Sequence, residues 1–369
     1  MFTFQLSSDD LFKERSQQFI SWGIPHSVIR DVQTKINNTW SEEEGGWAYE
    51  WSKKANDFEN KGKFLEASMM YAAAHFPVIS TSLREKALAK QIKNFEKAMK
   101  IKSIDFKRMN ISLDSTGTKM PVHLYNDDTN NKNPLILLTG GVDTGKMELH
   151  RMAYLIAKLG DFRVAAIDMP GTGESGVNLT PSSENIYIEL LNTLAPTGRK
   201  AIVGVSYGGH WAAKLALLGK VDASVNLGGP VIAFDKGGDF IRTLPNGMGG
   251  IIANALGLNE TPETDVFQSY TSKFSLESQG FFDKNQCSPM LVINGENDQY
   301  IPQQDSIIFK KYSDNDVWLM KGMTHCAAEG IARILPSIIT WLQQHLYGLN
   351  FKTNLKFKIT EAILPTRIL

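Results

Sequence analysis

The hydrophobic and polar positions of this chain follow two different rhythms. Up to about residue 105, apolar residues recur at spacings of three, four and seven, which is typical of amphipathic helices. The clearest case is residues 47–77, where a Lys-Gly-Lys turn separates two such helices and Pro77 ends the second: "WAYEWSKKANDFENKGKFLEASMMYAAAHFP". We therefore predict a helical domain over residues 1–105.

The rhythm changes after residue 105. The alternating runs "MNISLD" and "MPVHLY" flank "STGTK", which is typical of a hairpin, and apolar strands then alternate with helical stretches. This alternation predicts an α/β fold, with a mostly parallel sheet that helices cover on both faces. The predicted strands are 135–139, 163–167, 201–205, 223–227, 290–294 and 316–320, and the predicted helices are 147–159, 183–194, 207–218, 303–312 and 327–346.

This pattern assigns residues 106–348 to one α/β domain. The stretch from about 230 to 288 breaks the alternation and is too long for an ordinary loop, so we interpret it as a lid insertion. Residues 349–369 form a tail without a readable pattern.

Composition and charge narrow the function classes. Lys plus Arg equal Asp plus Glu at 39 each, so no net charge favours binding to nucleic acid or to a membrane surface. No apolar run approaches the ~18 residues of a membrane span, and acidic residues lie where a signal peptide needs an apolar core. The two cysteines, Cys287 and Cys326, fit neither a disulfide framework nor a zinc pattern. We expect a soluble cytoplasmic protein without a metal.

The strongest chemical signal is "AIVGVSYGGH", in which Gly204 to Gly208 spell G-x-S-x-G. The motif directly follows a predicted strand and opens a predicted helix, which is the setting of a nucleophile elbow. In such a turn the serine is exposed and the glycines avoid collisions with the neighbouring backbone. Ser206 is therefore the candidate nucleophile.

A serine hydroxyl needs a base, and the base needs an orienting acid. Asp298 and His325 follow the next two predicted strands after the lid, in the chain order Ser, acid, His that this fold uses. Because loops at the carboxyl ends of parallel strands converge on one crevice, we predict that these side chains meet. Glu296 is the competing acid. For His210 and His75 the sequence favours packing over a catalytic role.

The turn after the first buried strand imitates a phosphate-binding loop. In "LILLTGGVDTGKM", Gly140 to Lys146 spell G-x-x-x-x-G-K, but Met147 stands where the Mg²⁺-binding Ser or Thr would be. A nucleotide-driven ATPase is therefore a weak alternative. In a serine hydrolase this turn supplies an oxyanion-hole amide. We predict the donors to be the amides of Tyr207 and of Gly141 or Val142.

The chain resembles the FrsA-like esterases of the α/β-hydrolase superfamily and the related fungal polyketide-shortening hydrolases. Residues 45–77 resemble the helical cap of that group, and residues 138–175 resemble its oxyanion turn and the strand that follows; with "LVINGENDQYIP" and "GMTHC", the likeness covers most of residues 40–347. The resemblance implies an α/β-hydrolase domain under an N-terminal helical cap, with Ser206 as nucleophile, Asp298 as acid and His325 as base.

Ester hydrolysis through an acyl-enzyme, acting on a small-molecule ester or ketide without any cofactor, is the first hypothesis. Cleavage of a carbon–carbon bond is an alternative if aromatic cap residues line the site rather than forming the cap's own core. The residues concerned are Trp40, Trp47, Trp51, Tyr71 and Phe76. A non-catalytic regulatory protein on a hydrolase scaffold is a further alternative, and family caps that mediate dimers leave a homodimer as an expectation.

Overall fold

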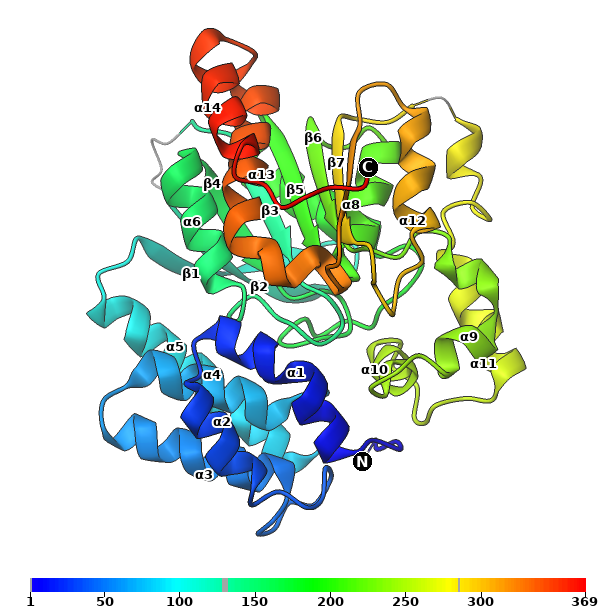
Figure 1. The fold of residues 1–369 in the computed structure, drawn as a ribbon. Helices are drawn as coiled ribbons and strands as arrows, with labels where there is room; N and C mark the ends of the chain where they lie inside the picture. The colour runs from blue at the N-terminus through cyan, green and yellow to red at the C-terminus, as the bar shows by residue number, and fades with distance from the viewer. Residues whose placement is uncertain (1, 128–131, 285) are drawn as a thin grey trace.

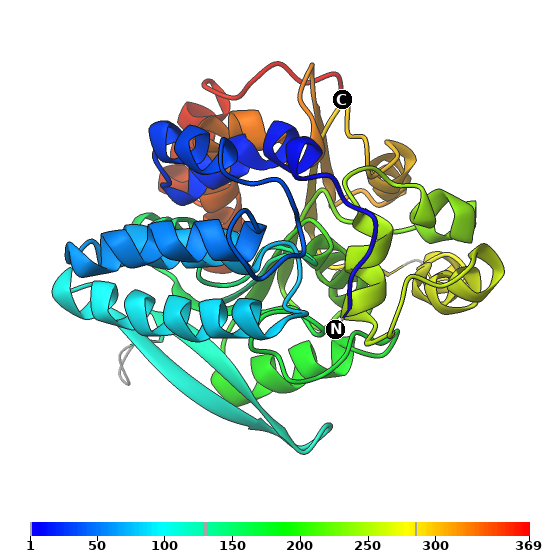
Figure 2. The ribbon, with the colours of Figure 1, turned by 90° about the horizontal axis from the view of Figure 1, so that it is seen from below.

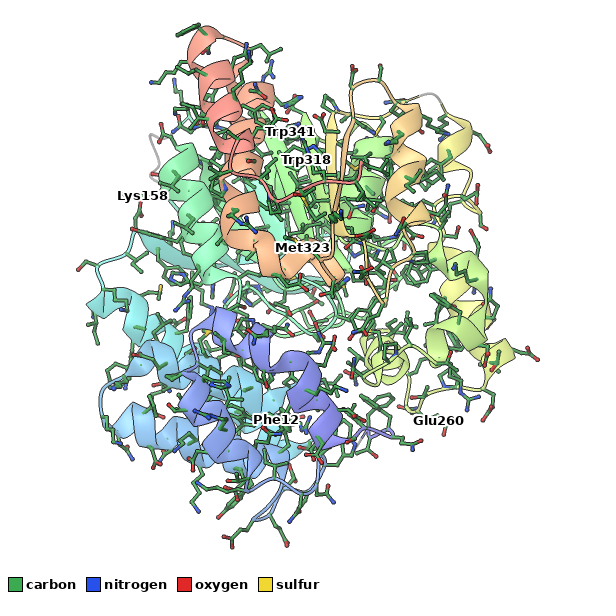
Figure 3. The ribbon with its side chains drawn as sticks, viewed as in Figure 1. Phe12, Lys158, Glu260, Trp318, Met323 and Trp341 are labelled. Atoms are coloured by element: carbon green, nitrogen blue, oxygen red, sulfur yellow. The ribbon has the colours of Figure 1, made fainter. Side chains whose placement is uncertain are left out.

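Five α-helices come before the first strand in the computed structural model, which describes residues 2–127, 132–284 and 286–369. They pack their apolar faces around large aromatic side chains, among them Phe12 and Phe19 of the first helix and Trp47 and Trp51 of the third. Figure 3 marks Phe12 within this group of helices. The helices are α1 Ser8–Trp22, α2 His26–Gln33, α3 Trp47–Asn60, α4 Phe64–His75 and α5 Ser82–Ile101. Helices α3 and α4 are the two that the sequence predicts on either side of the Lys-Gly-Lys turn.

The rest of the chain is built on an eight-stranded sheet with the order β1-β2-β4-β3-β5-β6-β7-β8. Strands β3 to β8 run parallel to one another, while β2 is antiparallel to both β1 and β4, so the predicted hairpin is confirmed. Every residue of β3 and β6 is buried, as a sheet covered on both faces requires. The strands are β1 Phe106–Leu113, β2 Thr118–Tyr125, β3 Leu135–Thr139, β4 Arg163–Ile167, β5 Lys200–Val205, β6 Ala223–Leu227, β7 Met290–Gly295 and β8 Asp316–Met320.

Helices cover both faces of the sheet, which confirms the predicted α/β fold class. Helices α6 (His150–Gly160) and α13 (Ile331–Tyr347) lie on one face, and α7 (Glu184–Leu194) and α8 (Gly208–Leu217) lie on the other (Figure 1). The predicted helix 303–312 is divided into α12 (Gln304–Ile307) and a 3-10 turn. The predicted start of the last helix at residue 327 is wrong, because Cys326 and Ala327 have φ of 58° and 48° and cannot continue a right-handed helix.

The insertion between β6 and β7 carries three helices that lie to one side of the sheet (Figure 1): α9 Gly238–Arg242, α10 Met248–Ala255 and α11 Thr264–Thr271. The N-terminal segment passes α10, where the ring of Phe4 packs so closely that a Cβ on Gly250 would lie 2.3 Å from it. Figure 2 shows this segment running beside α10 from below. The insertion is therefore in contact with the very beginning of the chain.

The tail has an ordered place although its sequence shows no pattern. Asn350 caps α14 (Phe351–Glu361), which packs along α13, and the residues after it run antiparallel beside β8. The Ile368 amide donates to the Leu319 carbonyl at 2.8 Å, and Trp318, labelled in Figure 3, stacks on Phe357. None of the helices in the described ranges has the length and apolar character needed to cross a membrane.

Candidate active site

Ser206 lies in a sharp turn between β5 and α8. Its φ is 55°, an uncommon conformation for a residue with a side chain. The turn is possible only because two neighbours are glycines: a Cβ on Gly204 would lie 2.0 Å from the Gly208 carbonyl oxygen, and one on Gly208 would lie 2.5 Å from the carbonyl oxygen of Gly140. The geometry is that of the strained strand-to-helix elbow that the sequence predicts.

The structure brings Ser206, His325 and Asp298 together from the ends of three strands. His325 Nε2 lies 2.9 Å from Ser206 Oγ, and His325 Nδ1 lies 2.7 Å from Asp298 Oδ2. With a proton on Nδ1 donated to the carboxylate, Nε2 is free to accept the serine proton. The competing acid Glu296 lies elsewhere and accepts a hydrogen bond from the Gly322 amide at 2.8 Å.

The carboxylate of Asp298 is held by donors on both oxygens. Oδ1 accepts the amides of Tyr300 and Ile301 at 2.8 and 3.1 Å, and Oδ2 accepts Asn294 Nδ2 at 2.8 Å in addition to His325. Burial by itself would raise the pKa of Asp298, but the bond to His325 and these other donors lower it below its usual value. Asp298 is therefore a fixed anion.

His325 is mostly buried, with 19% of its side chain exposed, and its ring meets the Tyr300 ring edge-on. Burial by itself would lower the pKa of His325. The neighbouring Cys326 sulfur and the Asp298 carboxylate outweigh that effect and raise the pKa well above the usual 6.5. The imidazole is thus a stronger base than a free histidine.

The predicted oxyanion donors lie around Ser206 Oγ. A Cβ on Gly141 would lie 2.9 Å from that oxygen and 3.3 Å from the Tyr207 amide nitrogen, so the turn after β3 passes close to the nucleophile. Val142 lines the same pocket as Ser206. Within the described part of the chain, the amides of Tyr207, Gly141 and Val142 donate to no protein acceptor. They are available to an oxygen bound at Ser206.

A small apolar pocket, about 40 Å³ in volume, opens beside Ser206. Most of its wall comes from the insertion, namely from Pro230, Ala233, Phe234, Phe240, Ile241, Leu244, Met248 and Ile252. The aromatic cap residues do not form it. Trp47, Trp51 and Tyr71 are buried in the core of the N-terminal helices, and Trp40 packs on Phe4.

The lysine of the turn that resembles a phosphate-binding loop already forms two ion pairs within the protein. Lys146 is fully buried, and its Nζ contacts carboxylate oxygens of both Asp168 and Glu174, the latter at 2.7 Å. These two anions hold the pKa of Lys146 above its usual value although burial alone would lower it. No group of three metal-binding side chains is found among the residues that the structure describes.

Of the two histidines expected to pack, His210 lies in the core, whereas His75 is half-buried and lines a cavity near the turn after β3. His210 is fully buried, bonds through Nδ1 to the Pro230 carbonyl at 3.0 Å, and burial lowers its pKa to about 3. His75 Nε2 contacts Gln91 Oε1 at 2.6 Å, away from Ser206.

Sequence reasoning missed a set of supporting residues on α1. Arg15 pairs with Asp143 at 3.0 Å and lies over the Tyr300 ring, while Glu14 accepts the Tyr300 hydroxyl at 2.9 Å. Gln18 donates to Thr144 at 2.8 Å. Helix α1 thus contacts both the turn after β3 and the loop that carries Asp298. The role of these residues follows only from their contacts in the folded protein, because nothing distinguishes them within the amphipathic pattern of α1.

The family model and the most similar curated proteins indicate the same family. The family model "Esterase FrsA-like" matches residues 30–347. Esterase FrsA of Vibrio cholerae is 26% identical over 324 residues, which span 82% of this chain and 77% of that protein. Esterase FrsA of Yersinia pestis is 24% identical over 323 residues, with the same coverage of both chains.

Solved structures share the fold at low identity. AbyA5 superposes with a TM-score of 0.78 at 19% identity, covering 92% of this chain and 94% of that one. The 2,6-dihydroxy-pseudo-oxynicotine hydrolase has a TM-score of 0.69 at 19% identity, covering 89% and 95%. These likenesses extend over the N-terminal helices as well as the sheet.

Proposed function

This chain belongs to the FrsA-like esterase family and is a hydrolase, and on that premise we propose that it cleaves carboxylic esters of small molecules through an acyl-enzyme on Ser206. The observation that carries the proposal is the continuous contact from Ser206 Oγ through the His325 ring to Asp298, with distances of 2.9 and 2.7 Å. Membership of the family supports ester hydrolysis in general. The contacts around Ser206 support the particular mechanism.

In the first half-reaction, Ser206 Oγ attacks the ester carbonyl carbon while His325 Nε2 takes the hydroxyl proton. Asp298 stays ionised, keeps the ring in the tautomer that leaves Nε2 free, and stabilises the imidazolium that forms. The carbonyl oxygen becomes an oxyanion and accepts hydrogen bonds from the Tyr207 amide and from Gly141 or Val142. The C–O bond then breaks, and His325 returns the proton to the departing alcohol.

The second half-reaction repeats these roles with water. His325 takes a proton from a water molecule as the water oxygen attacks the acyl carbon. The second tetrahedral intermediate collapses, the acid product leaves, and Ser206 Oγ recovers its proton from His325. No external co-reactant besides water enters this sequence.

The alternatives named from the sequence lose support. Carbon–carbon cleavage depended on an aromatic wall at the site, but Trp47, Trp51 and Tyr71 form the core of the helical region instead. Of the five aromatic residues named from the sequence, Phe76 alone lines a cavity near the turn after β3, and one ring does not make such a wall. A non-catalytic binding role does not require a strained serine beside an imidazole held by a carboxylate. Ester hydrolysis is therefore the function that the geometry favours.

The test is the replacement Ser206→Ala. We expect turnover of p-nitrophenyl esters to fall by about 10⁴-fold or more, because the nucleophile is lost while binding remains. A fluorophosphonate probe should label the unmodified protein and leave Ser206→Ala unlabelled. The exposed serine variant Ser182→Ala is the matched control and should behave like the unmodified protein. Normal turnover by folded Ser206→Ala would overturn the proposal.

A further inference from the structure

A second, larger cavity shares the lining residue Val142 with the apolar pocket. Its volume is about 240 Å³, against about 40 Å³ for the pocket at Ser206, and Val142 lines both. It is lined by the end of α4 and the segment 76–79, by Leu88 and Gln91 of α5, by the turns that follow β3 and β4, and by Asn254 of α10. The apolar pocket is too small for more than a few substrate atoms, and Val142 is the one residue that lines both spaces, so a substrate that occupies both has to pass this side chain.

The cavity is lined by three carboxyl groups, of which two are neutralised by cations. Asp143 pairs with Arg15 at 3.0 Å, and Asp168 pairs with the buried Lys146. Glu148 is different: among the described residues no salt bridge includes it. The cavity therefore contains one carboxyl group without a counter-charge.

Glu148 is nevertheless fixed in position. One carboxyl oxygen accepts the Gly145 amide at 2.6 Å, and the other accepts Gln91 Nε2, whose own carbonyl oxygen contacts His75. Each carboxylate oxygen keeps a further lone pair for another donor. Burial and the nearby charge of Asp168 raise the pKa of Glu148 to about 7. A cation bound next to Glu148 would offset the burial and the repulsion from Asp168 that disfavour its charged form.

Two side-chain amides belong to the lining of the cavity as well. Asn178, which is exposed, and Asn254, which is half-buried, line the cavity, and neither side-chain amide makes a hydrogen bond to the described residues. They can bind the polar atoms of a ligand. An anionic ligand is disfavoured, because all three acidic side chains face this space and both of the nearby cations are already paired.

We propose that this cavity is a substrate subsite for a protonated amine, with Glu148 as its counter-ion, so that the enzyme acts on esters carrying a basic nitrogen. The inference rests on the proposed function at Ser206, because it places one part of the substrate there. Glu148 binds the amine and takes no part in proton transfer to the ester.

The test uses a pair of esters that differ only in charge. The first is p-nitrophenyl 6-(dimethylamino)hexanoate, which is cationic at pH 7.5, and the second is its uncharged isostere, p-nitrophenyl 7-methyloctanoate. Replacement Glu148→Gln should lower kcat/KM for the cationic ester by about 10- to 100-fold, because a charge-assisted contact is lost. For the uncharged ester the change should stay within about threefold. Glu148→Asp, which keeps the charge, should retain part of the preference.

The matched control is Glu260→Gln, a carboxyl group on the exposed loop between α10 and α11 (Figure 3), which should alter neither ester. Equal losses for both esters in Glu148→Gln would show a structural role only and overturn the subsite. No loss for either ester would overturn it too, as would an unmodified enzyme that hydrolyses only the uncharged ester.

A binding measurement separates this inference from the proposed function. In Ser206→Ala protein, isothermal titration should show the cationic ester binding at least tenfold more tightly than the uncharged one, and Glu148→Gln in that background should abolish the difference. Failure of the serine to react with fluorophosphonate would refute the mechanism at Ser206 and leave this result standing. A reactive serine with no charge preference in the titration would refute the subsite alone.

Discussion

Two clusters of charged side chains lie at the carboxyl edge of the same sheet and differ in one respect. In the first, His325 joins the Asp298 carboxylate to the uncharged Ser206, and 19% of the His325 side chain is exposed. In the second, Lys146 is fully buried between Asp168 and Glu174. The first cluster ends in an uncharged hydroxyl that lines the apolar pocket, whereas in the second cluster the cation is held between two carboxylates. Charged residues after a strand therefore indicate catalysis when they lead to a nucleophile beside a pocket, and indicate structural support when their charges only neutralise one another.

The largest effect in this comparison is expected for Asp298→Asn. An amide at this position holds the imidazole in the wrong tautomer, so we expect kcat to fall by about 10⁴-fold with little change in stability. Ester hydrolysis and urea unfolding of the same preparation measure the two effects. Loss of activity only in proportion to loss of folded protein would contradict the assigned role.

For Lys146→Met we expect a large loss of stability and a small loss of activity. Removing the ammonium leaves the buried Asp168 carboxylate with backbone amide donors alone, while Glu174 keeps its ion pair with Arg108. We expect the unpaired buried charge of Asp168 to cost about 3–5 kcal/mol of unfolding free energy. Turnover per folded molecule should fall far less than in Asp298→Asn. A variant as stable as the unmodified protein in urea would show that this cluster does not hold the turns after β3 and β4.

The stability that Lys146→Met loses should depend on pH in a definite direction. In the unmodified protein the pKa of Asp168 is lowered, against its burial, chiefly by Lys146, so Asp168 contributes stability above its unfolded pKa and loses it as pH falls. Without Lys146 the buried carboxyl prefers its protonated form. The stability difference between the two proteins should therefore shrink as the pH falls below about 5.

A smaller effect, about tenfold per pH unit, is expected in the activity profile of the unmodified enzyme. Because the pKa of His325 is raised, kcat/KM should fall as pH drops through a value above 6.5, where the imidazole becomes protonated. The raised pKa has the opposite effect on stability. The contribution of His325 to the free energy of unfolding is complete below pH 6.5 and is lost as the pH rises through the raised pKa. An acid limb below pH 6 would contradict the assignment.

The smallest effect is expected for Glu296→Gln. This acid precedes Asp298 by two residues but only accepts an exposed amide, so kcat should stay within about twofold and stability within ~0.5 kcal/mol. A loss of activity in Glu296→Gln as large as that in Asp298→Asn would mean that the orienting acid had been assigned wrongly.

Much of the fold could be predicted because its signals are local. Strands β3 and β6 are short apolar runs whose predicted bounds match the structure, and Gly204 to Gly208 require the sharp turn that places Ser206. The chain order of Ser206, Asp298 and His325 predicted which side chains meet. The domain limits, the cytoplasmic location and a homodimer stay predictions.

The remaining features depend on contacts between distant parts of the chain. Arg15 looks like any polar residue of an amphipathic helix, and only its contact with Asp143 across 128 positions gives it a role. Glu148 lies in a turn whose sequence imitates a phosphate loop, which drew attention to Lys146 instead. The left-handed pair Cys326 and Ala327 was missed because helix propensity does not report a turn that the neighbouring strands impose.

The contacts of α1 mean that the site is assembled from both halves of the protein. Glu14 and Gln18 bond to Tyr300 and Thr144, which belong to loops on opposite sides of the nucleophile. A shortened form that begins after Ile24 would still contain Ser206, Asp298 and His325, yet it would lack the contacts of α1 that join those two loops. We therefore expect proteolytic cleavage near the amino terminus to lower the activity although the proposed catalytic residues all remain in the chain.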